Sequence, residues 1–137
     1  METTIKLDST NGQEIKIKST FLGSKPAKWD DRNWNNHIIH VKFNGKTTKF
    51  DFWGSLAKPK IEDEEKLIFA LYCFISDAVA AEESFEDFCA NFGYDNDSIK
   101  ALKTYKACET ANTKFNRVFD GVDIYDMLNE IQEKHNC

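Results

Sequence analysis

The stretch HIIHVKFNGKTTKFDFW, residues 37–53, carries the strongest structural signal in this chain. β-branched and aromatic residues dominate both of its halves, and such residues favour extended strands. The dipeptide Asn44-Gly45 stands between the halves. Asn-Gly is the strongest short-range signal for a tight two-residue turn. The stretch therefore predicts an antiparallel hairpin with strands at 37–43 and 46–53.

Two further strands are predicted upstream, at 4–9 and 14–23, because apolar and polar residues alternate in both. The segment STNGQ between them contains a second Asn-Gly turn signal. The side chains expected on the inward face are Ile5, Leu7, Ile15, Ile17 and Phe21. The polar segment SKPAKWDDRNWNN, residues 24–36, is expected to be a loop that carries two Trp residues.

Four helices are predicted downstream, at 62–81, 85–92, 98–118 and 123–134, from apolar residues that recur at helical spacing. Ser and Asp side chains accept hydrogen bonds from the first turn of a helix. The expected N-caps are Glu62 or Asp63, Ser84, and Asp97 or Ser98. Ser84 and Asp87 form a short capping box, and Gly93 is expected to end the second helix in the left-handed conformation.

The apolar faces of these helices are predicted to pack on one side of the sheet. The residues expected to be buried are Leu67, Ala70, Leu71, Phe74, Ile75, Ala78, Phe85, Phe88, Cys89, Phe92, Ala101, Leu102, Tyr105, Cys108, Ala111, Phe115, Val118 or Phe119, Ile124, Met127, Leu128 and Ile131. Strands followed by helices indicate an α+β fold. We expect one domain over 1–137, with an antiparallel sheet of about four strands in 1–55 and about four helices in 61–135.

The composition predicts a soluble cytoplasmic protein that folds without a cofactor. Its 137 residues, 41% of them hydrophobic, suffice for a core. The longest apolar run, at 67–75, is too short to span a membrane. The four cysteines, Cys73, Cys89, Cys108 and Cys137, are expected to be reduced and mostly buried, with a disulfide framework as the alternative. The terminal HNC is expected to be a frayed tail and not a metal site.

No pattern in the sequence predicts an enzyme. A calcium loop starting at Asp95 would have Ile99 and Lys100 at ligand and glycine positions, so YDND is interpreted as a turn between helices. The acidic pairs Glu82/Glu83 and Glu86/Asp87 fall in predicted exposed turns. Asp77, at the edge of an apolar stripe, is expected to be half-buried and to accept hydrogen bonds. The two histidines of HIIH would point to opposite faces of a strand and cannot chelate one metal.

The charge is distributed unevenly along the chain. Residues 1–60 hold eleven Lys/Arg and six Asp/Glu, a net of +5, whereas residues 61–97 hold one Lys and eleven Asp/Glu, a net of −10. An acidic surface can imitate nucleic acid and bind a basic groove of another protein. The residues proposed for such a surface are Glu62, Asp63, Glu64, Glu65, Glu82, Glu83, Glu86, Asp87, Asp95 and Asp97.

The basic N-terminal half suggests a different kind of contact. Aromatic rings beside cations can stack unpaired bases and hold phosphates. The residues proposed for such a nucleic-acid contact are Lys25, Lys28, Trp29, Arg32, Trp34, Lys42, Lys46 and Lys49. The alternative interpretation is structural, with Trp packed at the edge of the core and lysines that keep the sheet edge from aggregating.

Residues 47–119 resemble a broad group of small phage and prophage proteins. The resemblance is carried by TTKFDFWGSLA, LYCFISDA and above all SFEDFCANFGYDNDSIKALKTYKAC. It covers about half of the chain, and Ile99 stands where a basic residue is expected. The resemblance implies a bacteriophage accessory protein in the bacterial cytoplasm. Proteins of this kind are often suppressors of host defence, including anti-CRISPR proteins that bind an effector complex.

Three hypotheses follow from the sequence. The first is a non-enzymatic inhibitor that binds a host defence protein or ribonucleoprotein complex through the acidic surface. The second is a phage nucleic-acid-binding accessory protein that uses the basic, Trp-bearing half. The third is a structural or dimerising module whose strand edges pair between chains. A monomer or a small homo-oligomer is expected, with no membrane contact.

Overall fold

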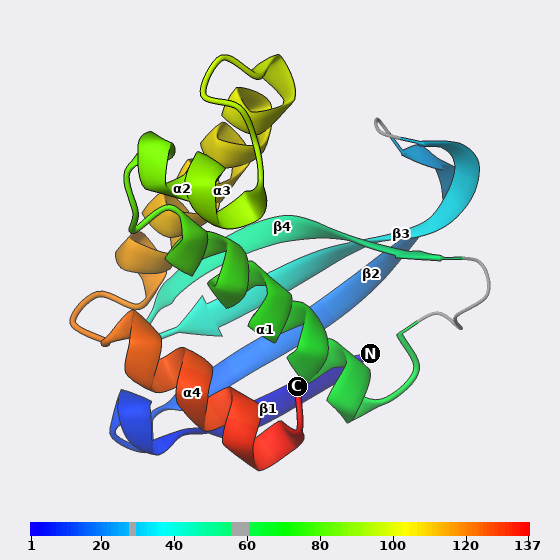
Figure 1. Cartoon of the computed structure of the whole chain (residues 1–137). Coiled ribbons are helices and arrows are strands. Elements are labelled where there is room, and N and C mark those ends of the chain that lie inside the picture. Colours follow the sequence, from blue (N-terminus) through cyan, green and yellow to red (C-terminus); the bar gives the residue numbers. More distant parts are fainter. Residues whose placement is uncertain (28–29, 56–60) are drawn as a thin grey trace.

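The computed structural model describes residues 1–27, 30–55 and 61–137 and confirms the α+β fold (Figure 1). α1 and α4 lie across one face of the sheet, and α2 lies beside α3 at its far corner. In chain order the elements are β1 (Glu2–Lys6), the 3-10 helix η1 (Asp8–Thr10), β2 (Glu14–Ala27), β3 (Asp30–Phe43), β4 (Lys46–Ser55), α1 (Glu64–Ala80), α2 (Phe85–Phe92), α3 (Ile99–Val118) and α4 (Ile124–His135).

The sheet has the strand order β1-β2-β3-β4, and every neighbouring pair is antiparallel. The predicted hairpin is confirmed, with Phe43 paired to Lys46 across the turn. Asn44 has a φ of 51° and Gly45 a φ of 78°. Both turn residues therefore adopt the left-handed region, which a tight hairpin turn of this type requires.

The prediction of a loop over residues 24–36 is wrong. Ser24 pairs with Asn35, and Lys25 with Trp34, so β2 and β3 continue through this segment as a ribbon, which β4 accompanies as far as the pair Trp34–Ser55. The ribbon curls away from the helices, at the right of Figure 1. Polar residues can form such a ribbon because the strands satisfy each other's backbone groups, and the Ser24 hydroxyl adds a 2.9 Å hydrogen bond to the Asn35 Oδ1. A register shift after Phe21 bends β2 there. Phe21 lies on the inward face as predicted, opposite the buried His37 with the two ring centroids 5.2 Å apart, but it is 38% exposed.

The helix boundaries agree closely with the prediction. The Asp63 side chain accepts a hydrogen bond from the backbone N–H of Lys66 at the start of α1. Ser84 and Ser98 cap α2 and α3 in the same way. Gly93 ends α2 with a φ of 73°, the left-handed conformation that glycine adopts without steric cost.

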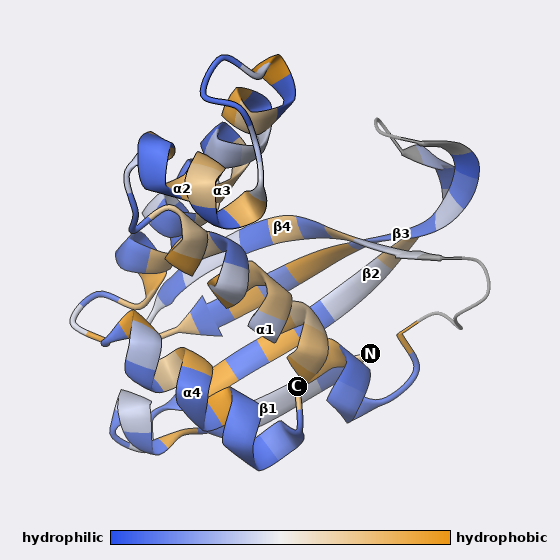
Figure 2. Ribbon diagram, in the orientation of Figure 1, coloured by the Kyte–Doolittle hydropathy of each residue, from blue (hydrophilic) through white to orange (hydrophobic). Residues whose placement is uncertain are grey.

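The main core lies between the sheet and α1, α3 and α4. Figure 2 shows apolar segments alternating with polar ones along β2 and β3, beneath a largely apolar α1. Phe119 anchors one end of this core, with its ring 4.9 Å from that of Phe43 and 5.0 Å from that of Phe115. The buried residues of this core are Ile5, Leu7, Ile15, Ile17, Ile39, Val41, Phe43, Ile61, Leu67, Ile68, Ala70, Leu71, Phe74, Ile75, Ala78, Phe115, Val118, Phe119, Ile124, Met127 and Ile131.

A separate small core joins α2 to α3. It contains Phe88, Cys89, Ala101 and Cys108. Phe92 is 58% exposed and Leu102 is 41% exposed, so their predicted burial is wrong. The eight-residue α2 packs mainly on α3 and can bury only one narrow face there.

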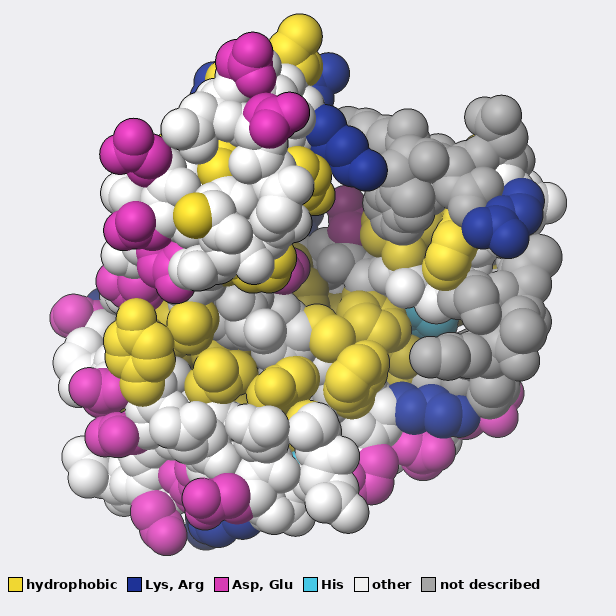
Figure 3. Space-filling model, viewed as in Figure 1, with side chains coloured by type: hydrophobic (Ala, Val, Ile, Leu, Met, Phe, Trp, Pro, Cys, Tyr) yellow, Lys and Arg dark blue, Asp and Glu magenta, His cyan; other side chains and the backbone are white. Residues whose placement is uncertain are grey.

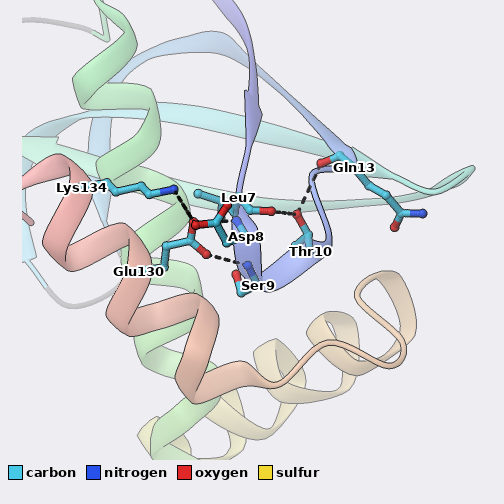
Figure 4. Close-up of polar contacts among 7 residues, drawn as sticks. All are labelled: Leu7, Asp8, Ser9, Thr10, Gln13, Glu130 and Lys134. Carbon is cyan, nitrogen blue, oxygen red and sulfur yellow. Dashed lines mark hydrogen bonds and ion pairs between the residues drawn. The ribbon is translucent and has the colours of Figure 1, made fainter.

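A carboxylate on α4 holds the helical layer to the end of β1 (Figure 4). Glu130 accepts hydrogen bonds of 2.7 Å from the backbone N–H groups of both Asp8 and Ser9, and one of 2.6 Å from Lys134. The chain end beyond α4 is not frayed as predicted, because the partly buried Cys137 packs against the main core.

Candidate functional site

The strands β2 and β3 carry opposite chemistry on their two faces. Ile15 and Ile17 point into the core and are fully buried. Lys16 and Lys18 alternate with them and are exposed on the outer face. In the register of the sheet, Lys16 stands opposite Lys42 of β3. The outer face therefore brings together lysines from different strands.

The pairing extends this cationic surface to β4. Lys18 stands opposite His40, and His40 stands opposite Lys49. Side chains that face each other across neighbouring strands are about 5 Å apart, so the facing ammonium groups of Lys16 and Lys42 repel one another when no anion is bound. We call this set of residues the basic floor. It consists of Lys16, Lys18, His40, Lys42 and Lys49, all of them exposed.

α3 lies along the free edge of β4. The Lys114 Nζ donates a 2.8 Å hydrogen bond to the carbonyl oxygen of Lys49, and the Arg117 Nη2 donates one of 2.9 Å to that of Thr47. One turn further, Lys46 forms a 3.9 Å ion pair with Asp120. Ascending numbers on α3 meet descending numbers on β4, so the helix runs antiparallel to the strand. Its cations cover carbonyl groups that an edge strand otherwise exposes.

Floor and helix enclose a groove of about 770 Å³ on the outer face. Lys114 and Arg117 border this groove, and they also border an adjoining depression that continues along α3 past Thr110 to Lys106. We call Lys106, Lys114 and Arg117 the basic wall. The carboxylates among the described residues that border the two hollows are Glu2 and Glu109. The groove is therefore strongly cationic.

The predicted nucleic-acid residues do not form one site. Lys42 and Lys49 lie on the basic floor, and Lys46 lies beside the turn that joins β3 to β4. Lys25 and Arg32 lie on the ribbon, with their charges 5.8 Å and 6.0 Å from the ring centroids of Trp53 and Trp34. Lys28 and Trp29 lie outside the described residues.

Trp34 and Trp53 border a different hollow, an aromatic cleft of about 840 Å³ between α1 and β4. Phe52 and Phe69 contribute further rings to its walls. The predicted contact is therefore divided: Lys25 and Arg32 lie beside these rings, whereas Lys42 and Lys49 lie on a separate surface. The sequence interpretation missed Lys16 and Lys18, although their alternation with Ile15 and Ile17 indicated the outer face.

The predicted acidic surface is divided between the two ends of α1. Glu62, Asp63, Glu64 and Glu65 lie at its beginning, and Glu82, Glu83, Glu86, Asp87, Asp95 and Asp97 lie beyond its end, all of them exposed. The 17 residues of α1 separate the two groups by about 25 Å, at 1.5 Å per residue. Figure 3 shows Asp and Glu side chains around the rim of the helical face, with apolar side chains across its middle.

Several of these carboxylates have local partners. Glu65 lies 3.5 Å from the His135 ring, Glu82 accepts a 3.0 Å hydrogen bond from Asn112, and Glu83 accepts one of 2.7 Å from Asn91. Glu86 and Asp97 have no hydrogen bond or ion pair to a described side chain. The second group, around α2, is thus the larger of the two, and it includes carboxylates without a partner among the described residues.

Asp77 is exposed and not half-buried as expected, and it does not have the hydrogen-bonding role expected of it. It borders a hollow between α1, α3 and β4, and no described residue donates a hydrogen bond to its carboxylate. Loss of hydration in this hollow raises its pKa. The protein keeps this acidic group beside the Phe50 and Phe74 rings, which stack at 4.4 Å.

The cysteines are free thiols, as expected, and Cys89 and Cys108 are buried. Burial, assisted by the charge of Asp77, raises the pKa of Cys108 to about 11. That thiol is therefore protonated and unreactive at neutral pH. Within residues 1–27, 30–55 and 61–137, no three His, Cys, Asp or Glu residues are grouped in a way that could hold a metal ion.

The chain matches no protein family, no curated protein and no solved structure. The resemblance to phage proteins therefore stays a prediction. None of the described helices has the length and apolar character needed to cross a membrane.

Proposed function

We propose that this protein is a non-enzymatic binding protein that holds the phosphate backbone of a nucleic acid in the groove between the basic floor and the basic wall. One observation carries the proposal: a chain with a net charge of −5 gathers seven Lys and Arg residues and one His around one groove and the depression that adjoins it. Such a concentration of one sign of charge attracts polyanions.

The side chains of the groove suit phosphate well. Lysine ammonium groups bind phosphate as point charges, and the exposed Thr47 hydroxyl and His40 ring can add hydrogen bonds. Each neutralised phosphate releases condensed counterions, so the binding affinity falls steeply as salt rises. Contacts to the backbone carry no sequence information, so weak sequence preference is expected.

The test is fluorescence anisotropy with labelled oligonucleotides of mixed sequence, titrated from low to moderate salt. Wild-type protein should bind at low salt and lose affinity as salt rises, whereas a Lys16→Glu/Lys42→Glu variant should lose binding. Lys66→Glu on α1 is the matched control, because Lys66 lies on the helical side and forms only an exposed 3.7 Å pair with Asp63. Absence of wild-type binding at low salt would end the proposal.

A second candidate function is inhibition of a host defence complex by a phage-type protein, through the carboxylates around α2. The observation that favours it is a grouping of exposed carboxylates on α2 and on the turns before and after it: Glu82, Glu83, Glu86, Asp87, Asp95 and Asp97. Dense negative charge can occupy a nucleic-acid groove of another protein.

That candidate is tested by pull-down from bacterial lysate with and without nuclease. A Glu86→Lys/Asp97→Lys variant should lose a nuclease-resistant protein partner, whereas Glu64→Lys/Glu65→Lys, at the other end of α1, should keep it. A partner that both variants retain, or that nuclease removes, would contradict inhibition through this surface.

A further inference from the structure

We propose that the nucleic acid in the groove is double-stranded, with one backbone on the basic floor and the other against the basic wall. The inference rests on the proposed function and adds the class of nucleic acid. Two observations point to it: the geometry of the two surfaces, and the absence of Phe, Tyr and Trp from the described residues that border them.

The floor and the wall present cations in different directions. The floor is the outer face of a sheet whose strands lie about 4.8 Å apart. The wall is a helix that runs along the edge of that sheet, fixed by the contacts of Lys114 and Arg117 with β4 carbonyl groups. From Lys106 to Arg117 the helix advances by about 16 Å, at 1.5 Å per residue. The wall is therefore long enough to follow a backbone.

Single-strand binding depends on aromatic rings on which bases stack. Among the described residues that border the groove and its continuation along α3, none is Phe, Tyr or Trp. Trp34 and Trp53 instead border the aromatic cleft between α1 and β4. A single strand in the groove would have phosphate contacts but no support for its bases.

A duplex needs no such support, because its bases remain stacked on each other. It presents two backbones at a fixed separation, about 6 Å across the minor groove and about 12 Å across the major groove of B-form DNA. The floor lysines are held in a four-stranded sheet, and the wall is held to that sheet by hydrogen bonds. Two surfaces of positive charge on rigid elements can each contact one of two rigid backbones, at little cost in ordering entropy.

The experiment compares a labelled mixed-sequence duplex with each of its two strands, all titrated at 50 mM salt by fluorescence anisotropy. We expect the duplex to bind at least about tenfold more tightly than either strand, with a steeper dependence on salt. Lys106→Gln should weaken duplex binding about fivefold and reduce its salt slope by about 1. The same substitution should leave the weaker binding of single strands unchanged, because only the second backbone reaches the wall.

Lys66→Gln on α1 is the matched control and should change neither affinity. Equal or tighter binding of single strands, or equal loss of both ligands in Lys106→Gln, would overturn the inference and leave the proposed function intact. Failure of wild-type protein to bind either ligand at 50 mM salt would overturn the proposed function itself. The two failures are therefore distinguishable in one set of titrations.

Discussion

On the inner face of the sheet, Ile15 and Ile17 are fully buried beneath the helices, whereas Lys16 and Lys18, their neighbours in the sequence, are exposed on the outer face. The inner face removes apolar area from water, which stabilises the fold by about 25 cal/mol per Å². The outer face keeps its charges hydrated and close together, which contributes little to stability. Alternate residues of the same strands therefore have different roles: the inward residues stabilise the fold, and the outward residues are available for binding.

The largest effect is expected from the inner face. Ile17→Ala removes a fully buried side chain and should lower the free energy of unfolding by about 2–5 kcal/mol, because a cavity remains in the core. Its neighbour Lys18→Ala should change stability by less than about 0.5 kcal/mol. Urea denaturation followed by circular dichroism measures both. Similar losses of unfolding free energy in the two variants would contradict the different roles of the two faces.

The next effect concerns the helical layer over the inner face. Burial raises the pKa of Glu130, but the hydrogen bonds from Lys134, Ser9 and Asp8 outweigh it and lower the pKa to about 2. A carboxyl group whose pKa is depressed in the folded state stabilises that state above its unfolded pKa. This stability is lost as pH falls from about 4.5 to about 2.

Glu130→Gln should therefore destabilise the protein at pH 7 by roughly 2–3 kcal/mol. The difference from wild type should shrink as pH falls towards 2. Urea denaturation at a series of pH values measures this convergence. Glu133→Gln, an exposed residue of the same helix, is the control. If the loss of stability in Glu130→Gln stayed constant down to pH 2, the hydrogen bonds to the carboxylate would not be the cause of that loss.

The third prediction concerns the exposed lysines of the outer face. Lys42→Gln/Lys49→Gln should leave stability within about 0.5 kcal/mol of wild type, because both side chains are exposed. The same variant should weaken nucleic-acid binding by roughly tenfold or more and reduce the salt slope by about 2. Denaturation and anisotropy on one preparation test both parts. If binding and stability were both unchanged, the basic floor would not be part of the nucleic-acid contact.

The smallest effect is expected at the turn that sets the register of both faces. Gly45 has a φ of 78°, and the space around its Cα is open. Gly45→Ala should thus cost about 1 kcal/mol through backbone strain alone. The matched control Gly54→Ala has no positive φ to strain. Thermal unfolding compares the two, and an equal loss would argue against strain at the turn.

The local rules of the sequence predicted most of the fold. The Asn44-Gly45 turn, the caps at Asp63, Ser84 and Ser98, and the buried stripe of α1 each depend on neighbours within a few residues. The ribbon over residues 24–36 was not predicted, because its strands carry polar residues and its pairing depends on a partner strand. The exposure of Phe92 was missed because periodicity does not reveal how much a short helix can cover.

The candidate site was predicted only in part, for a similar reason. Lys42 and Lys49 stood out beside a clear turn signal, and the alternation around Lys16 and Lys18 held the same information. Lys114 and Arg117 lie more than sixty residues from the strand that they contact, so only the folded structure places them in the groove. The acidic residues were close in sequence but are separated in space by the length of α1.

The most direct test of the account is an NMR titration of the ¹⁵N-labelled protein with a short duplex. We expect amide and lysine side-chain signals to shift for the basic floor and for residues 106–117 of α3, while signals of α4 and α2 stay in place. Shifts concentrated in α2 and the turn that follows it, or an unchanged spectrum at low salt, would contradict nucleic-acid binding on the outer face of the sheet.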